Sequence, residues 1–182
     1  MPAGLTIFVA TYLVFIEAGV AVLILGWLAY NKPRGWLVRW AVAAILILAL
    51  SYIFAKIGGA VYRDPRPFTQ DHVKPLISHA RDNGFPSDHA LLAAALVALL
   101  LFTGDWWWAV PLAVMAVLVD WARVGSGLHH VVDVVGSSLF VLVAILIAVA
   151  ATPFVVSLLY PHLPAAFREG LSPQRDTLKS GT

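Results

Sequence analysis

The sequence predicts an all-α integral membrane protein, a bundle of about five transmembrane helices, and three observations support this fold class. Apolar residues make up 60% of the 182 residues and charged residues 12%, whereas a soluble domain carries about a quarter charged residues. The mean hydropathy is +0.85. Apolar runs of roughly 20 residues, the length that crosses a bilayer, recur along the chain. The polar surface is too small to face water on all sides, so membrane lipids are expected to cover much of it.

Five segments are expected to form the bundle. They are 5–30, 36–57, 87–102, 106–124 and 129–160. The segment 58–85 is polar and contains prolines, so it cannot span. Ser87 has the residue type and position of an N-cap, which marks the start of the third and shortest helix. Gly125 and Gly127 interrupt the chain before the last helix, and Pro153 is expected to end or kink that helix.

The predicted bundle forms one domain, residues 1–160, followed by a polar and loose cytoplasmic tail, 161–182. Five spans place the two termini on opposite sides of the membrane, so the loops 58–85 and 124–130 share one side. Basic residues divide evenly between the two sides, so the positive-inside rule alone does not decide the orientation. If several basic residues of these two loops bind a ligand, the other side is cytoplasmic. The two loops are therefore expected outside the cytoplasm.

Charge and cysteine content exclude several classes of function. The formal net charge is +2 and no long basic run is present, which argues against a nucleic-acid partner. The chain has no cysteine, so disulfides, thiolate catalysis and cysteine-based zinc sites are excluded. No cofactor is expected, and nothing in the sequence indicates an oligomeric state.

Three polar segments are expected to meet at the extracytoplasmic membrane boundary. They are Lys56 with Arg63–Phe68, then Phe85–His89, and then Arg123–Asp133. Arginine guanidinium groups match phosphate oxygens two at a time. The N–H groups that follow an N-cap form an anion site, and Ser87 would place them at this boundary. His89 would stand at the same helix start.

A histidine and a carboxylate on the last helix complete the pattern. His129 and Asp133 are four residues apart and share one helix face. The carboxylate can hold one ring nitrogen as N–H and leave the lone pair of the other nitrogen free to attack. Each motif alone has a plainer explanation: an interfacial loop at Arg66, an ordinary cap at Ser87, a structural hydrogen bond at His129. Their joint occurrence favours a site for phosphoryl transfer to nitrogen.

These segments resemble the signature of the type 2 phosphatidic acid phosphatase superfamily, which also contains the vanadium haloperoxidases. That signature has a Lys and an Arg-Pro, then Pro-Ser-Gly-His, then Ser-Arg-x5-His-x3-Asp. The spacing of Arg123, His129 and Asp133 matches the third motif. The resemblance implies a metal-free site with His129 as nucleophile, Asp133 as its orienting carboxylate and His89 as general acid. The implied phosphate ligands are Arg66, Arg123, Lys56, Ser87 and the N–H of Asp88, with Arg63 as a further candidate.

The chain departs from the family pattern at three places. Asp88 replaces the glycine of the second motif, and the resulting Ser-Asp-His resembles the bacterial undecaprenyl-diphosphate phosphatases of this superfamily. Ala122 replaces the serine before the arginine of the third motif. The Arg-Pro pair begins at Arg66, ten residues after Lys56, although Arg63 has the expected seven-residue step. We expect Arg66 to be the main ligand and leave open whether Lys56 or Arg63 takes the role of the family's lysine.

The resemblance implies a multi-pass phosphatase of the bacterial cytoplasmic membrane, acting on a lipid phosphate or diphosphate at a site that faces outward. Undecaprenyl diphosphate is the favoured substrate, hydrolysed to the monophosphate through a phosphohistidine for carrier-lipid recycling in cell-wall synthesis. One alternative is a phosphatase for phosphatidic acid, phosphatidylglycerophosphate or another prenyl phosphate. Another is a non-catalytic lipid-phosphate transporter or binding protein, which would lack the nucleophile or the acid.

Two acidic residues inside the predicted spans remain to be explained. Glu17 lies in the middle of the first span, where a carboxylate is costly enough to suggest a function. Two explanations are open. Glu17 contacts the substrate or takes part in proton transfer, or it is protonated or hydrogen-bonded within the bundle. Asp120 precedes Arg123 by three residues on one helix face, which favours an orienting ion pair between them.

Overall fold

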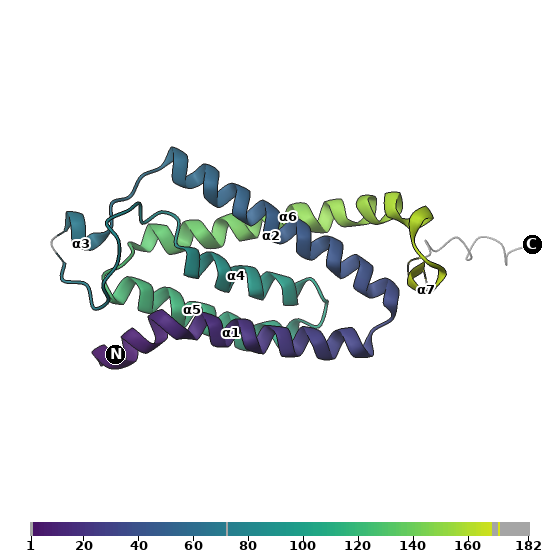
Figure 1. Ribbon diagram of the computed structural model, residues 1–182, viewed down its shortest axis with the longest axis horizontal. Helices are drawn as coiled ribbons and strands as arrows, with labels where there is room; N and C mark the ends of the chain where they lie inside the picture. The colour runs from purple at the N-terminus through teal and green to yellow at the C-terminus, as the bar shows by residue number, and fades with distance from the viewer. Residues whose placement is uncertain (1, 72, 169–170, 172–182) are drawn as a thin grey trace, which may run out of the picture.

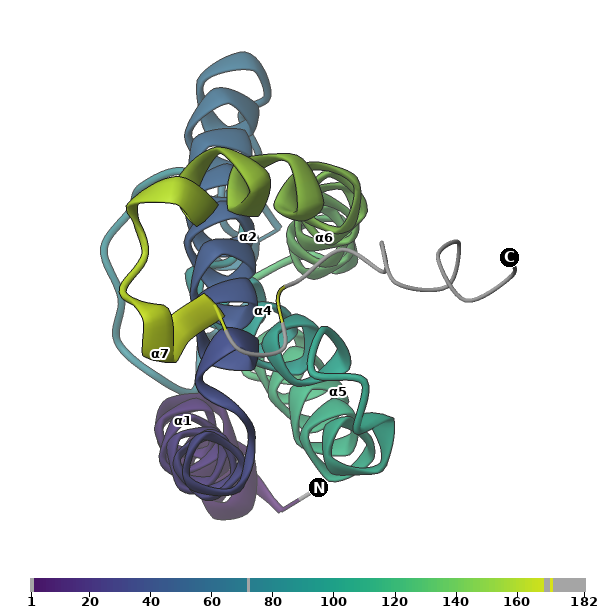
Figure 2. The ribbon, with the colours of Figure 1, turned by 90° about the vertical axis from the view of Figure 1, so that its right-hand side faces the viewer.

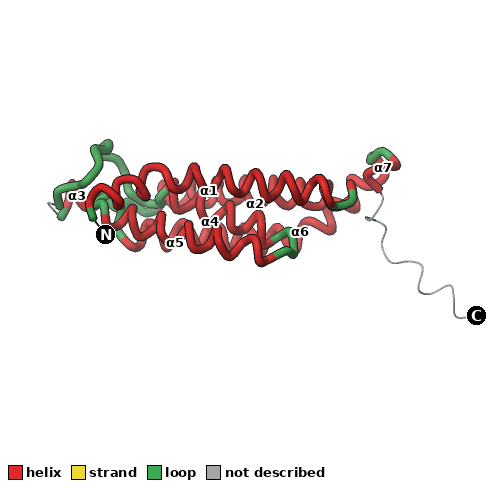
Figure 3. The backbone as a smooth tube through the Cα atoms, turned by 90° about the horizontal axis from the view of Figure 1, so that it is seen from below, coloured by secondary structure: helices red, strands yellow, loops and turns green. Residues whose placement is uncertain are grey.

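The computed structural model describes residues 2–71, 73–168 and 171. Within these residues every regular element is a helix and no β-strand is present (Figure 1). The elements in chain order are α1 (Ala3–Asn31), α2 (Arg34–Val61), α3 (Pro67–Gln70), α4 (Asp88–Leu101), the 3-10 helix η1 (Trp106–Trp108), α5 (Ala109–Gly125), α6 (Val131–Leu159), the 3-10 helix η2 (Tyr160–His162) and α7 (Ala165–Arg168). The five longest helices lie side by side along the long axis of the molecule (Figures 1 and 3). The predicted fold class, an all-α membrane protein, is confirmed.

Four helical segments in the described residues are long and apolar enough to cross a membrane: α1, α2, η1 with α5, and α6 with η2. The fifth predicted span, α4, has 14 residues, which is about 21 Å of helix and shorter than a bilayer core. It packs against α1, α2, α5 and α6 and lies at the centre of the bundle in the end-on view (Figure 2). Half of its residues are buried, and four of these are alanines. Small side chains let neighbouring helices approach closely within a membrane.

The helices alternate in direction, so the connections gather at two ends of the bundle (Figure 1). At one end lie the α2–α4 loop with α3, the turn from α5 to α6, and the start of α1. At the other end lie the turn from α1 to α2 and the turn from α4 to η1. An ion pair joins these last two turns, with Lys32 Nζ 2.9 Å from Asp105 Oδ2. The chain thus places the loops 58–85 and 124–130 at one end, as the sequence predicts.

Of the two outcomes expected for Pro153, an end of the last helix is excluded, because α6 continues past it to Leu159. The segment after Tyr160 is not loose where the structure describes it: η2 and α7 follow, and α7 packs against α2. Leu171 is buried against Val42 and Val156, so apolar contacts hold this segment to the bundle. The rest of the predicted tail, 169–170 and 172–182, lies outside the described residues.

Candidate active site

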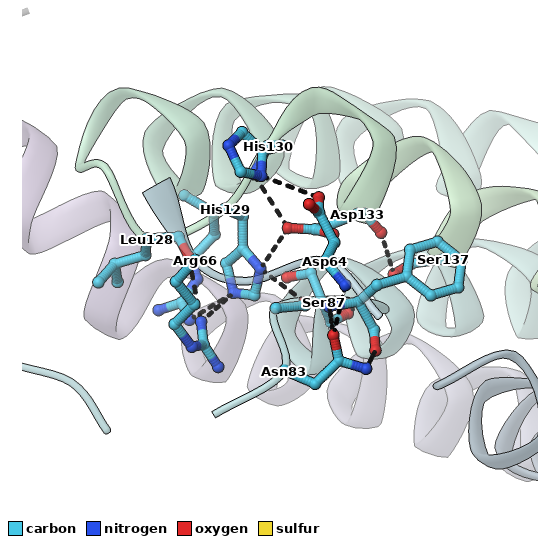
Figure 4. Close-up of polar contacts among 12 residues, drawn as sticks. Asp64, Arg66, Asn83, Ser87, Leu128, His129, His130, Asp133 and Ser137 are labelled. Carbon is cyan, nitrogen blue, oxygen red and sulfur yellow. Dashed lines mark hydrogen bonds and ion pairs between the residues drawn. The ribbon is translucent and has the colours of Figure 1, made fainter. Parts of the chain in front are cut away.

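His129 and Asp133 form the centre of the site, at the start of α6 (Figure 4). The ring Nδ1 of His129 lies 3.2 Å from Asp133 Oδ2 and 3.0 Å from the carbonyl oxygen of Gly84. Both partners are acceptors, so Nδ1 carries the proton and Nε2 keeps its lone pair. His129 is 2% exposed and Asp133 is fully buried. The predicted pair is therefore present, with the free nitrogen held in one direction.

Two buried arginines converge on that free nitrogen. Arg66 Nη1 lies 3.2 Å from His129 Nε2, and Arg123 Nη2 lies 3.1 Å from the same atom. Backbone oxygens hold each guanidinium from behind: Leu128 O is 3.1 Å from Arg66 Nη1, and Ala10 O of α1 is 3.3 Å from Arg123 Nη1. Like charges this close repel, so an anion next to Nε2 would relieve the repulsion. The geometry therefore favours binding of a phosphate directly in front of the attacking nitrogen.

Burial lowers the pKa of His129 below its ordinary value. The hydrogen bond to Asp133 opposes this shift, while the positive charges of Arg123 and Arg66 add to it. The neutral ring is therefore the dominant form near neutral pH. A neutral imidazole has the lone pair that a nucleophile needs.

The start of α4 forms the second side of the site. Ser87 is its N-cap and is fully buried, but within the part of the chain that the structure describes no side chain caps the helix and Ser87 Oγ has no hydrogen-bond partner. Ser137 Oγ of α6 donates to Ser87 O at 3.0 Å, which fixes this end of α4 against the helix that carries Asp133. The N–H groups of the first turn of α4, including that of Asp88, therefore stay available to an anion.

His89 is the second residue of α4 and is half-buried. Its ring makes an edge contact with Phe15 of α1, with 6.1 Å between ring centroids. Arg123 and His129 both lie close enough to act electrostatically on this ring. The side chain therefore lies near the cationic end of the site, and its role as proton donor to a departing oxygen stays a prediction.

Lys56 and Arg63 are not brought to His129. Lys56 is exposed on α2, with its ammonium 5.2 Å from the centroid of the Tyr52 ring. Arg63 is exposed and lines an open cavity of about 450 Å³ together with Arg81. Among the described residues, no hydrogen bond joins either cation to the His129 ring, so the structure supports Arg66 as the main ligand of the first segment.

Asp82 restrains Arg66 from the solvent side and was missed in the sequence. Its Oδ1 lies 2.6 Å from Arg66 Nε, and its side chain is 56% exposed. Partial burial raises the pKa of Asp82, but the hydrogen bond and charge of Arg66 outweigh it, and the pKa lies below the ordinary value. Asp82 thus stays ionised and fixes the guanidinium in its direction.

His130, the neighbour of His129 in the sequence, ties the loop to the bundle. Its Nδ1 lies 2.8 Å from Asp64 Oδ2 and its Nε2 lies 2.9 Å from Asp71 Oδ2. The hydrogen bond to Asp71 raises the pKa of His130; burial opposes this shift and Asp64 adds to it. The backbone N–H of His130 also donates to Asp133 Oδ2 at 2.9 Å. His130 therefore positions both the loop and the Asp133 carboxylate. In the sequence, this role is indicated only by Asp64 and Asp71, the two aspartates on either side of Arg66.

Ligand atoms of Asp64, His130 and Asp133 all lie within 4.8 Å of one another, a spacing that could hold a metal ion. These atoms are engaged with the protein itself: Asp64 with His130, and Asp133 Oδ2 with two donors. Among residues 2–71, 73–168 and 171, the buried Asp133 Oδ1 has no hydrogen-bond partner. The chemistry of this cluster fits hydrogen bonding to imidazole as well as it fits a metal.

Asn83 and Gly84 shape the loop that passes over Asp133. Asn83 Oδ1 accepts from the backbone N–H of Asp64 at 2.8 Å, and Asn83 Nδ2 donates to Phe85 O at 2.9 Å. A Cβ on Gly84 would lie 3.0 Å from Asp133 Oδ2 and 3.0 Å from Asp64 O. Glycine is needed there because the backbone approaches the carboxylate closely.

The expected ion pair between Asp120 and Arg123 is not formed, so that expectation was wrong. The Arg123 guanidinium points to His129 and to α1, and Asp120 Oδ1 and Arg123 Nε have no hydrogen-bond partner among the described residues. Glu17 is fully buried, and both of its carboxylate oxygens likewise have no partner in the described parts of the chain. Neither acid contacts the His129 ring.

Fold and site together define a multi-pass helical membrane protein with a buried, arginine-lined histidine at one end of the bundle. Comparison with protein families places it more closely: residues 40–158 match the model of the PAP2 superfamily. This match covers more than half of the chain, and the chain belongs to that superfamily, as the three motifs predict.

Individual relatives are similar over most of the chain. The undecaprenyl-diphosphatase BcrC of Bacillus subtilis (strain 168) is 33% identical over 138 residues, which is 74% of this chain and 66% of that protein. The bacitracin transport permease protein BcrC of Bacillus licheniformis is 33% identical over 138 residues, 72% of this chain and 63% of that protein. YbjG of Escherichia coli (strain K12) is 27% identical over 165 residues, 91% of this chain and 81% of that protein.

The matched region spans just under two thirds of the two Bacillus proteins. No solved structure matches the chain.

Proposed function

We propose that this protein is a lipid phosphate phosphatase that hydrolyses undecaprenyl diphosphate to the monophosphate through a phosphohistidine. One observation carries the proposal: the free Nε2 of His129 faces two buried guanidinium groups, while its Nδ1 is held by Asp133. A nucleophile, a carboxylate that orients it, and preorganised cations are the parts that phosphoryl transfer to nitrogen requires.

The reaction follows from this placement. The lone pair of His129 Nε2 attacks the terminal phosphorus, a P–N bond forms, and the bond from phosphorus to the bridging oxygen breaks. His89 donates a proton to that oxygen. Arg66 and Arg123 exchange their contact with Nε2 for the equatorial phosphate oxygens and stabilise the charge of the transition state. Water then attacks the phosphohistidine, with His89 now accepting a proton, and releases inorganic phosphate.

The choice of lipid is supported by the relatives and by the second motif. The name of the Bacillus subtilis relative gives undecaprenyl diphosphate as its substrate, and Ser87-Asp88-His89 resembles that branch of the superfamily. Hydrolysis of this lipid at an outward-facing site of the bacterial cytoplasmic membrane would recycle the carrier for cell-wall synthesis. Phosphatidic acid, phosphatidylglycerophosphate and other prenyl phosphates are the competing substrates.

A purified-protein assay tests the proposal. Phosphate release is measured from undecaprenyl diphosphate and from the competing lipids in the same detergent. His129→Ala should abolish release and the acid-labile protein phosphate that a short quench traps, whereas Ser157→Ala, far along α6, should retain both. Activity of His129→Ala within about tenfold of wild type, a loss of only ~1.4 kcal/mol of transition-state stabilisation, would remove it as nucleophile.

A metal-free mechanism is part of the proposal, because two guanidinium groups already supply the charge that a metal would bring. Orthovanadate should inhibit as a mimic of the phosphoryl transition state, and EDTA should leave the rate unchanged. Loss of activity in EDTA that magnesium restores would assign a metal to the cluster of Asp64, His130 and Asp133.

The name of the Bacillus licheniformis relative describes a transport permease, so a non-catalytic lipid-phosphate carrier is the second candidate for the function of this protein. A carrier would bind the lipid without releasing phosphate, and His129→Ala would leave its binding and transport unchanged. Turnover by the purified protein in detergent decides between the two.

A further inference from the structure

A groove between α5 and α6 opens toward the lipid, with α4 as its floor. Its volume is about 230 Å³, and apart from two polar residues at one end its lining is apolar. Alanines contribute much of the floor and one wall, with Ala94 and Ala98 from α4 and Ala113 and Ala116 from α5. Figure 2 shows α4 between these two helices. Small side chains on the inner surfaces leave the space that forms the groove.

The groove begins next to the proposed phosphate site. Its polar end is made by Asp120 of α5 and Ser138 of α6. Asp120 lies one helical turn before Arg123, about 4.5 Å along the axis, and Ser138 follows Ser137, which bonds the start of α4. From Asp120 the lining continues along α5 to Ala113, roughly 10 Å deeper into the bundle. The helices α4, α5 and α6, which provide His89, Arg123 and Asp133, thus also line the groove.

We infer that this groove holds the first part of a single hydrocarbon chain of the lipid substrate while the phosphate is bound at His129. The inference rests on the proposed function and adds a second binding site to it. An apolar channel that starts one turn from the cations and opens sideways to the bilayer fits a ligand with a charged head and an apolar tail. The exposed side chains of Val117 and Leu142, 66% and 51% exposed, flank this opening.

The size of the groove favours one chain over two. Pockets that enclose a whole drug-sized ligand measure roughly 300–1,000 Å³, so about 230 Å³ takes only a chain segment. A prenyl diphosphate presents one chain and fills the groove. A diacyl lipid phosphate presents two, and one of them stays outside. The groove therefore accommodates a segment of one hydrocarbon chain at a time.

Prenyl diphosphates of increasing length, assayed in mixed micelles, test this inference. For the wild type, kcat/KM should rise with chain length until the groove is filled and then level off. Ala113→Phe and Ser138→Phe fill the groove and should lower kcat/KM for the long substrates about tenfold, the effect of losing burial of roughly two methylene groups. Turnover of the shortest substrate should stay within about twofold, which also shows that the variants are folded.

Ala41→Phe is the matched control, because Ala41 is exposed on α2 and lies outside the groove lining; it should behave as wild type with every substrate. Equal losses on long and short substrates, or no loss on either, would overturn the inference. A change of oligomeric mass in Ala113→Phe would instead assign the groove to an interface between two copies of the chain.

A wild-type protein that hydrolyses none of these lipids would refute the proposed function alone. In that case a prenyl phosphate with a photoreactive group near its head still tests the groove. Crosslinks to peptides of α5 and α6 around residues 113–120 and 138–145 would support it, and crosslinks confined to the outer face of α2 would refute it.

Discussion

Arg66→Ala, compared with Arg63→Ala and Lys56→Ala, is the sharpest test of how the site binds phosphate. Arg66 is 5% exposed, and its guanidinium is fixed by Asp82, by Leu128 O and by the His129 ring. Pro67 follows it at the first position of α3 and restricts the backbone there. The cation is therefore aimed at the phosphate site before substrate arrives.

The expected losses differ because the three cations are held differently. Removing a preorganised, charge-assisted donor from a dry site costs about 3 kcal/mol or more, roughly a hundredfold in kcat/KM. Arg63 and Lys56 are exposed, and an exposed charge contributes about 1 kcal/mol or less, at most about fivefold. Arg66→Ala leaves the Asp82 carboxylate 56% exposed, so it can be solvated. It also leaves the buried Leu128 O without its donor, so a loss of about 1–3 kcal/mol of stability is expected and is measured separately from activity.

The assay is kcat/KM of the three variants on one lipid substrate, with the unfolding temperature of each measured in the same detergent. Arg66→Lys is the matched variant: it keeps the charge but loses the planar fork, and it should recover only part of the activity. If Arg63→Ala proves the most damaging, the seven-residue step from Lys56 marks the true motif, and the assignment of Arg66 is refuted.

Three further predictions concern the loop over the site. Gly84→Ala should lower kcat at least about tenfold, because the new Cβ meets a carboxylate oxygen and a carbonyl oxygen at 3.0 Å, whereas Gly4→Ala, with open space around it, should match wild type. The pKa of His130 is raised by Asp71, so its stabilisation is complete below its unfolded pKa of ~6.5 and is lost as pH rises through the folded value. The difference in unfolding temperature between wild type and His130→Gln should therefore shrink at alkaline pH, and a difference that grows would refute this pairing. Lys74→Cys in this cysteine-free chain should react with an impermeant thiol reagent on intact cells, and labelling only after lysis would reverse the orientation.

Parts of the site that depend on one helix could be predicted from the sequence. His129 and Asp133 meet at 3.2 Å, as their spacing suggests, but they do not share a helix face. His129 precedes the N-cap His130, and only Asp133 lies within α6. Ser87 occupies the N-cap position of α4 as its residue type indicates, although its side chain makes no cap hydrogen bond. In both cases the sequence indicates where a helix starts, and the start of the helix determines where the residue lies.

Contacts that depend on the conformation of the α2–α4 loop could not be predicted. Asp64 and Asp71 reach His130 across more than 50 residues of sequence, and Asn83 holds the loop through five backbone groups. Nothing periodic in the segment 62–86 encodes these pairings. Asp120 shows a different limit of prediction from sequence. A shared helix face permits an ion pair with Arg123, but the guanidinium instead contacts His129 Nε2 and the carbonyl oxygen of Ala10 in α1.

The position of Lys56 could have been derived from the helix that carries it. The buried residues of α2 include Ala44, Ile47, Ser51 and Ala55, a stripe with steps of three and four residues that faces the bundle. Lys56 follows Ala55 directly and is turned about 100° from that stripe, so its ammonium lies toward the exposed Tyr52 ring. Because α2 continues as a helix to Val61, the backbone of Lys56 also lies more than one turn before the end of the helix and so away from the loop. A residue in the role of the family's lysine must come from the inner face of the helix or from beyond its end. Arg63 lies beyond the end of α2, but its side chain is exposed, so Arg66 remains the cation of this segment that reaches His129.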